Sequence, residues 1–217
     1  MYKNISSKIK YAYLNLQATY SQRIDNNQTA LLIIHVVQEY SMEQNLDQLK
    51  YPIGKFQQPP HIDKQQIDQW ISIIEAFPQQ LSEEVINLTE QDFEKQYRPG
   101  GWTIRQVLNH CADSHMNSMI RFKLALTEDT PTIKPYYEDR WAELSDSKDI
   151  PVESALKMLE GLHERWVHLL KGLSESDLER QFIHPDNDAL TSLKTNIGIY
   201  AWHCEHHLAH VRNAKLR

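Results

Sequence analysis

The chain has 217 residues, of which 24% are charged and 41% hydrophobic, and its formal net charge is −6. This length suits one well-cored domain, and the composition is ordinary for a soluble globular protein. An acidic balance without a Lys/Arg cluster argues against a nucleic-acid binder held by phosphate contacts. Only two cysteines are present, Cys111 and Cys204, without CxxC spacing, so we expect reduced thiols in a cytoplasmic protein.

Residues 1–41 differ from the rest of the chain. Their apolar run, residues 30–37, is too short to span a bilayer and lies too deep for a signal peptide, so we expect no membrane contact. Met42 opens a segment that reads like a natural start, and residues 38–41 can be encoded by a bacterial ribosome-binding site at a normal distance from it. We therefore expect residues 1–41 to be a non-native upstream extension or a disordered tail, and residues 42–217 to form the functional domain.

Four segments carry apolar residues at the three- and four-residue spacing of amphipathic helices. They cover about residues 63–88, residues 103–127, a stretch that begins near residue 151, and residues 192–215. Asp63 and Gln66 fit a capping box at the start of the first segment, and Pro78 is expected to kink or split it. No convincing strand is visible, so the sequence predicts an all-α fold, an antiparallel four-helix bundle of up-down-up-down order.

A long loop, residues 128–150, separates the second predicted helix from the third. It holds Tyr136, Tyr137 and Trp141 together with two prolines. An aromatic-rich loop of this length is usually functional or packed over a site. We therefore expect it to contribute to a binding pocket.

Histidine is the residue type that stands out, because the chain has eleven and four of them lie between residues 203 and 210. On a helix, His203 and His207 are about 40° apart on one face, and so are His206 and His210. Two imidazoles at this spacing can converge on one metal ion. Periodicity alone does not choose between the two pairs.

A third ligand must come from another helix, because two histidines rarely hold zinc well. The second predicted helix offers His110 and His115, which lie about 140° apart around its axis, so only one can face a shared centre. His110 shares a polar stripe with Asp113, Asn117 and Arg121, which is unusual for the inside of a bundle. The stripe therefore favours His110 over His115 as the third ligand.

Several motifs between residues 51 and 210 form a specific pattern, among them Tyr-Arg-Pro-Gly-Gly-Trp-Thr-Ile-Arg-Gln-Val at 97–107 and Tyr-Ala-Trp-His-Cys-Glu-His-His-Leu-Ala-His at 200–210. This pattern resembles the YfiT family of metal-dependent hydrolases in the DinB-like superfamily. The resemblance implies a four-helix bundle, a homodimer, and one divalent ion, Zn²⁺ or Ni²⁺, bound by His110, His203 and His207. Family members have His-His where this chain has Asn109-His110, so the ligand is kept and its neighbour is lost.

Three histidine ligands leave a coordination position open, as in catalytic rather than structural zinc sites. Water in that position would give a hydroxide nucleophile and a hydrolase, whereas a thiolate would give a thiol S-transferase. The superfamily includes transferases that use bacillithiol, so the resemblance favours activation of this small thiol for transfer to an electrophilic substrate. A non-catalytic, metal-stabilised binding module is the remaining alternative.

The sequence assigns no catalytic base. Arg121, Arg105 and Lys134 could receive the carboxylates of an anionic thiol, although each could equally be a solvated charge. Aromatic side chains could wall the pocket or simply belong to the core. We predict four substrate-binding residues, namely Asn117, Arg121, Trp102 and Tyr136, and we expect both cysteines to be core thiols.

Overall fold

The computed structural model describes residues 46–186 and 188–217. The predicted extension, residues 1–41, and the proposed start at Met42 lie outside the described residues. The division of the chain at residue 42 therefore stays a prediction.

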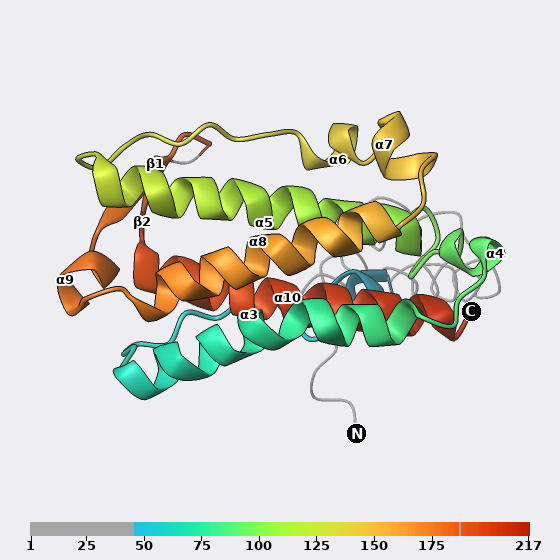
Figure 1. Cartoon of the computed structure of the whole chain (residues 1–217), viewed down its shortest axis with the longest axis horizontal. Coiled ribbons are helices and arrows are strands. Elements are labelled where there is room, and N and C mark those ends of the chain that lie inside the picture. Colours follow the sequence, from blue (N-terminus) through green and yellow to red (C-terminus); the bar gives the residue numbers. More distant parts are fainter. Residues whose placement is uncertain (1–45, 187) are drawn as a thin grey trace, which may run out of the picture. The chain divides into compact units, whose positions relative to one another are not determined.

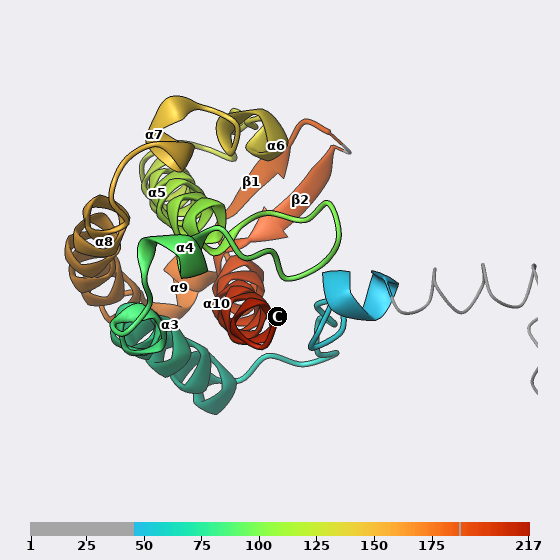
Figure 2. The ribbon, with the colours of Figure 1, turned by 90° about the vertical axis from the view of Figure 1, so that its right-hand side faces the viewer.

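Four long helices form the bundle (Figures 1 and 2). They are α3 (Lys64–Val85), α5 (Ile104–Thr127), α8 (Glu153–Lys171) and α10 (Leu193–Lys215). Four one-turn helices lie in the connections: α4 (Glu90–Phe93), α6 (Glu138–Trp141), α7 (Ser145–Lys148) and α9 (Glu175–Leu178). The predicted four-helix bundle is confirmed, with boundaries close to those expected from the apolar spacing.

Three of the long helices begin at a side-chain cap. Asp63, Thr103 and Ser192 each accept a hydrogen bond from the backbone N–H three residues further on. Thr103 forms a full capping box with Gln106, whereas the box predicted for Asp63 forms only its first half. Such caps satisfy N–H groups that the first turn leaves free, and so they fix where each helix starts.

The directions of the helices differ from the up-down-up-down expectation. α3 and α10 run one way, and α5 and α8 run the other way (Figure 1). Because α3 and α5 each pack against both α8 and α10, every helix has one parallel and one antiparallel neighbour. Two contacts between α3 and α10 agree with a parallel arrangement. Trp70 lies against Gly198 and Glu84 pairs with Arg212, so residue numbers increase in the same direction along both helices.

The predicted long loop is the reason for the parallel pair α5 and α8. It returns the chain along α5 to the end of the bundle where α5 began, and it contains α6 and α7, which both contact α5 (Figure 1). The Gln106 amide donates to the carbonyl oxygen of Ala142 at 2.8 Å, and the Arg105 guanidinium donates to that of Ile150 at 2.8 Å. The loop is therefore a crossover connection tied to the start of α5.

A small hairpin precedes α10. β1 (Gln181–His184) pairs antiparallel with β2 (Ala189–Ser192). Ile183 also exchanges backbone hydrogen bonds with the crossover, donating to Pro131 at 2.9 Å and accepting from Ile133 at 3.0 Å. This hairpin was not expected from the sequence, because strands of four residues are too short to show alternation.

The apolar stripes of the four helices form the core. Its largest fully buried side chains include Trp166, Phe77, Phe122 and Phe182. Pro78 does not split α3, which continues through it to Val85. The predicted split is therefore wrong, because packing of the apolar face on both sides of Pro78 outweighs the loss of one backbone hydrogen bond, whereas the alternative of a kink stays a prediction.

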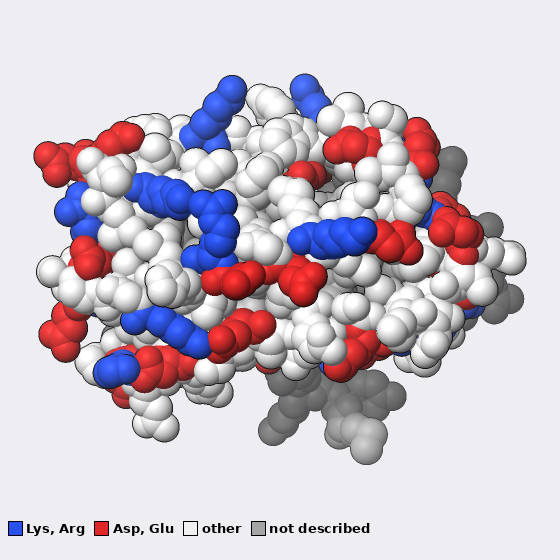
Figure 3. All heavy atoms as spheres, in the orientation of Figure 1, with Lys and Arg blue, Asp and Glu red and all other residues white. Residues whose placement is uncertain are grey.

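Acidic and basic side chains are interspersed on the face shown in Figure 3. Several form ion pairs between helices, such as Lys171 with Glu75 at 2.6 Å and Lys215 with Glu84 at 2.7 Å. Within the described residues, no helix combines the length and the apolar character that crossing a membrane requires.

Candidate metal centre

Three histidines from two antiparallel helices meet inside the bundle. His110 comes from α5, and His203 and His207 come from successive turns of α10. One ring nitrogen of each lies within 4.8 Å of the corresponding nitrogens of the other two. His110 and His207 are buried, and His203 is partly exposed. The fold therefore brings the three predicted ligands together.

The spacing of these nitrogens fits a metal ion. His110 Nε2 lies 3.3 Å from His203 Nε2. Two nitrogens bound to one tetrahedral zinc, at Zn–N distances of about 2.0–2.1 Å, stand about 3.3–3.4 Å apart. Three imidazoles and an open fourth position are also a usual donor set for catalytic zinc, and imidazole suits nickel as well.

A second set of histidines also meets the distance criterion. His206, His207 and His210 place one nitrogen each within 4.8 Å of one another. In this set, His210 Nε2 already bonds the carbonyl oxygen of Lys50 at 3.1 Å, and His206 stacks on Trp202 with ring centroids 4.5 Å apart. The distances between ring nitrogens therefore do not choose between the pairs His203/His207 and His206/His210, just as helical periodicity did not.

A cavity favours the first set. It has a volume of about 490 Å³ and reaches His203, and its wall also includes Ser114, Arg121, Tyr136 and Tyr200. An ion bound by His110, His203 and His207 would therefore lie next to space that a small substrate can enter. The side chain of Arg121 adds positive charge to this cavity, and its Nε atom is buried without a hydrogen-bond partner among the described residues.

The predicted substrate-binding residues have different surroundings. Arg121 and Tyr136 line the cavity, and Trp102 lies against His110 with ring centroids 4.5 Å apart. Asn117 instead donates its amide to the backbone carbonyl of Asp113 at 2.8 Å, and it does not belong to the cavity wall. Arg121 and Tyr136 are therefore placed to contact a substrate in this cavity, whereas neither Asn117 nor Trp102 belongs to its wall.

Arg105 is not available as an anion-binding residue. Its guanidinium bonds Glu90 at 2.6 Å and Glu94 at 3.0 Å, besides the crossover carbonyl of Ile150. The side chain is buried and joins three segments of the chain. The structure does not support the sequence-based suggestion that it receives a substrate carboxylate, because each of its three nitrogens already donates a hydrogen bond and it lies outside the cavity wall.

Burial keeps the candidate ligands neutral. It lowers the pKa of His110 to about 3, with the nearby His206 ring as a second cause. Burial, followed by the neighbouring imidazoles, also holds the pKa values of His203 and His207 well below the usual range. A neutral imidazole has one lone pair to offer, which is the form that binds a metal.

Both cysteines are buried free thiols. Burial raises the pKa of Cys111 and that of Cys204, so neither is a thiolate near pH 7. Nucleophilicity and metal binding both require the thiolate. The two residues therefore serve as core side chains, as the sequence indicated.

Two further buried histidines lie behind the centre. Helical geometry offered His115 as the alternative to His110, whereas the sequence assigned no role to His163 on α8. Both are almost fully buried, and the His115 ring contacts His203 on the side away from His110. A polar ring on an apolar helical face was the one signal available, and it does not reveal a partner on another helix.

The fold and the histidine cluster agree with what the chain is similar to. The DinB superfamily model matches residues 73–211. A "Putative metal-dependent hydrolase" of Bacillus cereus strain AH820 is 52% identical over 172 residues, which is 79% of this chain and 98% of that protein. A protein of the same name from Bacillus anthracis strain A0248 shows the same identity and coverage. The chain therefore belongs to the DinB superfamily.

Within that superfamily the chain is of the YfiT type. YfiT from Bacillus subtilis, described as "a probable metal-dependent hydrolase with an unusual four-helix bundle topology", is 45% identical, with a TM-score of 0.76 over 78% of this chain and 97% of that one. A mycothiol-dependent maleylpyruvate isomerase is 13% identical, with a TM-score of 0.55 over 67% of this chain and 60% of that one. This second likeness shows a shared fold alone.

Proposed function

We propose that this protein is a metal-dependent enzyme that activates a low-molecular-weight thiol, such as bacillithiol, for S-transfer to an electrophile. His110, His203 and His207 hold one divalent ion, Zn²⁺ or Ni²⁺. The observation that carries the proposal is the convergence of their ring nitrogens beside a cavity that also contains Arg121.

The cavity suits a small anionic molecule. Arg121 has a buried Nε atom with no partner among the described residues, so its guanidinium has donor capacity for a carboxylate. Tyr136 and Tyr200 add aromatic surface to the same wall. An anionic thiol could thus be held by its carboxylate at Arg121 while its sulfur approaches His203.

A bound zinc or nickel ion supplies one kind of chemistry here, the lowering of the pKa of a coordinated thiol. The protein's residues do the rest. His203 and His207 direct their rings from successive turns of α10, and Trp102 packs against the ring of His110. Arg121 orients the thiol by its carboxylate, so that the sulfur and the electrophile meet in the cavity.

Hydrolysis of a small substrate is the second candidate. Glu138 lines the same cavity, and burial, followed by the charge of Asp139, raises its pKa. Burial, followed by the charge of Asp146, raises the pKa of Asp113 to about 6. A carboxyl group whose pKa is raised toward neutral suits general acid–base catalysis, and of these two only Glu138 lines the cavity. The names of the Bacillus relatives point the same way.

One experiment separates these functions. The metal-loaded protein is assayed with bacillithiol and a chromogenic electrophile, and in parallel with esters and amides without thiol. We expect conjugation that disappears in the metal-free protein and in His203→Ala, and that persists in His168→Ala, which changes an exposed histidine of α8. Hydrolysis without thiol would favour the second candidate. Inactivity in both assays with the metal bound would favour a binding module.

The native metal and the assembly are further parts of the proposal. Elemental analysis of protein purified without added metal is expected to find zinc or nickel at one ion per chain. Light scattering on the eluting protein is expected to give the mass of the homodimer that the family resemblance implies. A monomer at all concentrations would contradict the dimer and leave the metal site unaffected.

A further inference from the structure

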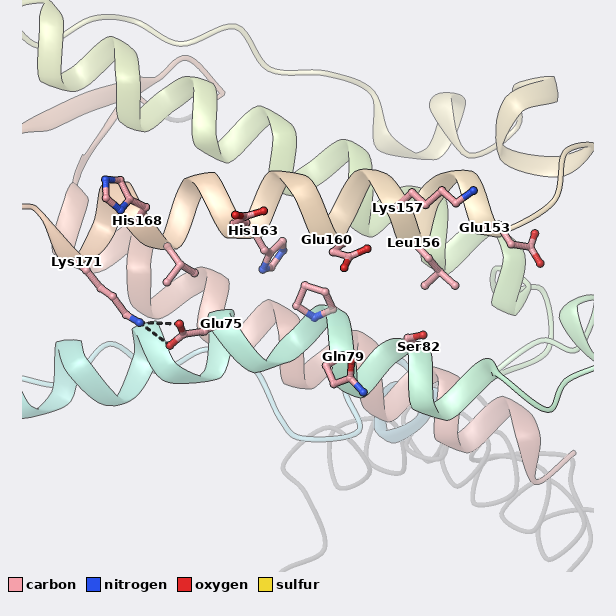
Figure 4. A pocket seen from close by; sticks show the side chains of 13 residues that line it. Glu75, Gln79, Ser82, Glu153, Leu156, Lys157, Glu160, His163, His168 and Lys171 are labelled. Carbon is pink, nitrogen blue, oxygen red and sulfur yellow. Dashed lines mark hydrogen bonds and ion pairs between the residues drawn. The ribbon is translucent and has the colours of Figure 1, made fainter.

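A row of imidazole rings leads from α3 to the proposed metal centre. His163 Nδ1 lies 2.7 Å from the carbonyl oxygen of Ile74, and His163 Nε2 lies 2.7 Å from His115 Nδ1. His115 Nε2 in turn lies 3.0 Å from His203 Nδ1. Figure 4 shows His163 reaching from α8 toward α3 in the groove between the two helices. The row therefore joins three long helices to one metal ligand.

Pro78 explains why the first carbonyl is free. In an α-helix the carbonyl of Ile74 accepts from the N–H of residue 78, and proline has no N–H. The carbonyl of Ile74 is thus left without its usual partner inside a continuous helix. His163 Nδ1 occupies this position instead. The proline that weakens α3 locally thereby creates a fixed hydrogen-bond acceptor in the core.

The carbonyl sets the direction of every hydrogen bond in the row, because a carbonyl oxygen can only accept. His163 donates to it from Nδ1, which leaves His163 Nε2 as an acceptor. His115 must then donate from Nδ1 and accept at Nε2, so that His203 donates from Nδ1. The Nε2 atom of His203 is left without a proton, and it is the nitrogen that faces His110.

A shorter row holds the other ligand of α10. His210 Nε2 lies 3.1 Å from the carbonyl oxygen of Lys50, to which it must donate. His210 Nδ1 is then an acceptor, and it lies 3.3 Å from His207 Nδ1. His207 therefore donates from Nδ1 and also keeps a bare Nε2. The ring of His210 is held in place by Tyr97, with centroids 3.7 Å apart.

We propose that His163, His115 and His210 are positioning residues that fix the tautomers of His203 and His207, so that both ligands present an unprotonated Nε2 to the metal. This inference rests on the proposed function, because it takes the three-histidine metal centre as given. It also separates the two histidine pairs of α10, since His210 supports a ligand and does not bind the ion. Outer partners of this kind orient a ligand and raise its basicity.

The surroundings of His115 and His163 favour the neutral form that this order of hydrogen bonds requires. His115 and His163 are 0% and 2% exposed. Phe77 lies against both rings, with centroids 5.3 Å and 5.7 Å away. Such apolar contacts disfavour a charged imidazolium. Each ring of the longer row then donates one hydrogen bond and accepts one, apart from His203, whose acceptor nitrogen is kept for the ion.

The first test reads the tautomers directly. Nitrogen-15 NMR of the metal-free, full-length protein at pH 7.5 distinguishes a protonated Nδ1 from a protonated Nε2 in each histidine. We expect Nδ1 protonation in His163, His115, His203 and His207, and Nε2 protonation in His210. A proton on Nε2 of either His203 or His207 would overturn the proposal, whatever the protein does with metals.

The second test uses metal affinity, measured by competition with a chelator for Zn²⁺. His115→Leu removes both hydrogen bonds and is expected to weaken binding by about 10–100-fold. His115→Gln keeps one donor and one acceptor and is expected to restore much of the affinity. His168→Leu, on an exposed position of α8, is the control and should bind like the wild type. Equal affinity in the two His115 variants would contradict the proposal.

The two proposals fail differently. If the wild type binds no Zn²⁺, or His203→Ala binds it equally well, the metal centre itself is wrong. If the wild type binds Zn²⁺ and only the metal-centre variants lose it, the positioning row is wrong. Circular dichroism and thermal unfolding of each variant show whether a lost affinity reflects lost folding.

Pro78→Ala tests the origin of the row. It restores an N–H that competes with His163 for the carbonyl of Ile74. We expect a more stable protein that nevertheless binds Zn²⁺ less tightly, a combination that a purely structural role of Pro78 would not produce. Unchanged affinity, with the same tautomer at His163, would contradict this role of Pro78.

Discussion

Two arginines of α5 show how the surroundings of a residue determine its role. Arg105 is buried and uses its donors on Glu90, Glu94 and the backbone of Ile150. Arg121 lines the cavity beside His203, and its Nε atom has no partner within the described chain. The first residue holds the crossover in place, whereas the second is the one that the proposed function assigns to substrate binding.

Arg121→Gln tests that difference at the substrate. Charge-assisted hydrogen bonds contribute about 1.5–3 kcal/mol, so we expect KM for an anionic substrate to rise by about tenfold or more. Zn²⁺ affinity should stay unchanged, because Arg121 belongs to neither histidine set that could hold an ion. Steady-state kinetics measure the first quantity and chelator competition the second. Lys123→Gln, on an exposed position of the same helix, is the control, and an equal effect there would speak against a specific contact.

Helix packing depends at one point on a missing side chain. A Cβ atom at Gly198 of α10 would lie 2.8 Å from the Trp70 ring of α3, whereas a Cβ at Gly161 of α8 would have no neighbour within 4 Å. Both glycines lie inside long helices. At this point of the parallel pair α3 and α10, any side chain larger than that of glycine would displace the Trp70 ring.

This pair of glycines gives a matched prediction. Gly161→Ala should stabilise the protein by about 1 kcal/mol, because alanine favours the helix. Gly198→Ala has the same helical gain but overpacks against Trp70, which costs about 1–3 kcal/mol. Urea unfolding should therefore rank Gly161→Ala above Gly198→Ala in stability. Equal gains in both variants would show that the ring of Trp70 moves freely.

The stability of the whole molecule depends on pH, because several histidines are buried as neutral rings. Burial lowers the pKa of His163 to about 4 and that of His210 to about 3. The ordinary value in an unfolded chain is about 6.5. Between these values the unfolded chain binds more protons than the folded protein, so acid favours unfolding. Asp113, with its pKa raised to about 6, and Glu138, whose pKa burial also raises, act in the opposite direction, but the buried histidines with lowered pKa values outnumber them.

We therefore expect the free energy of unfolding of the metal-free protein to have its full value above about pH 7. It should fall as the pH decreases from about 6.5 to about 4. His163 alone accounts for about 3 kcal/mol over this range, taking about 1.4 kcal/mol for each pH unit. Urea titrations at pH 7.5, 6 and 5 measure the effect. A stability that stays constant between pH 7.5 and pH 5 would contradict the neutral, buried state of these rings.

Metal binding should stabilise the folded protein as well. An ion that binds only the native state adds about 2.7 kcal/mol to the free energy of unfolding at a free concentration of 100 times Kd. Thermal unfolding with and without Zn²⁺ measures the shift, which should vanish in His203→Ala and persist in His168→Ala. A shift that survives in His203→Ala would place the ion elsewhere, with His206, His207 and His210 as the alternative set.

Much of the fold could be predicted from local patterns in the sequence. The spacing of apolar residues predicts the long helices to within a few residues of their ends, and the cap predicted at Asp63 marks the start of the first one. Both are properties of neighbouring residues and need no information from elsewhere in the chain. The hairpin was missed because its strands are too short, and the alternation of directions was wrong because a long connection can return the chain to either end of a bundle.

By itself the sequence determined that the histidines of α10 share one face and that α5 offers His110 or His115 as a partner. Only the tertiary structure showed the cavity at His203 and the partners of Arg105. It also showed that His163 bonds both His115 and the carbonyl oxygen of Ile74, which Pro78 leaves without its usual helical partner. The reason is physical. Helical periodicity states which side chains point in the same direction, whereas a hydrogen bond between helices depends on how the helices pack, and no local pattern contains that information.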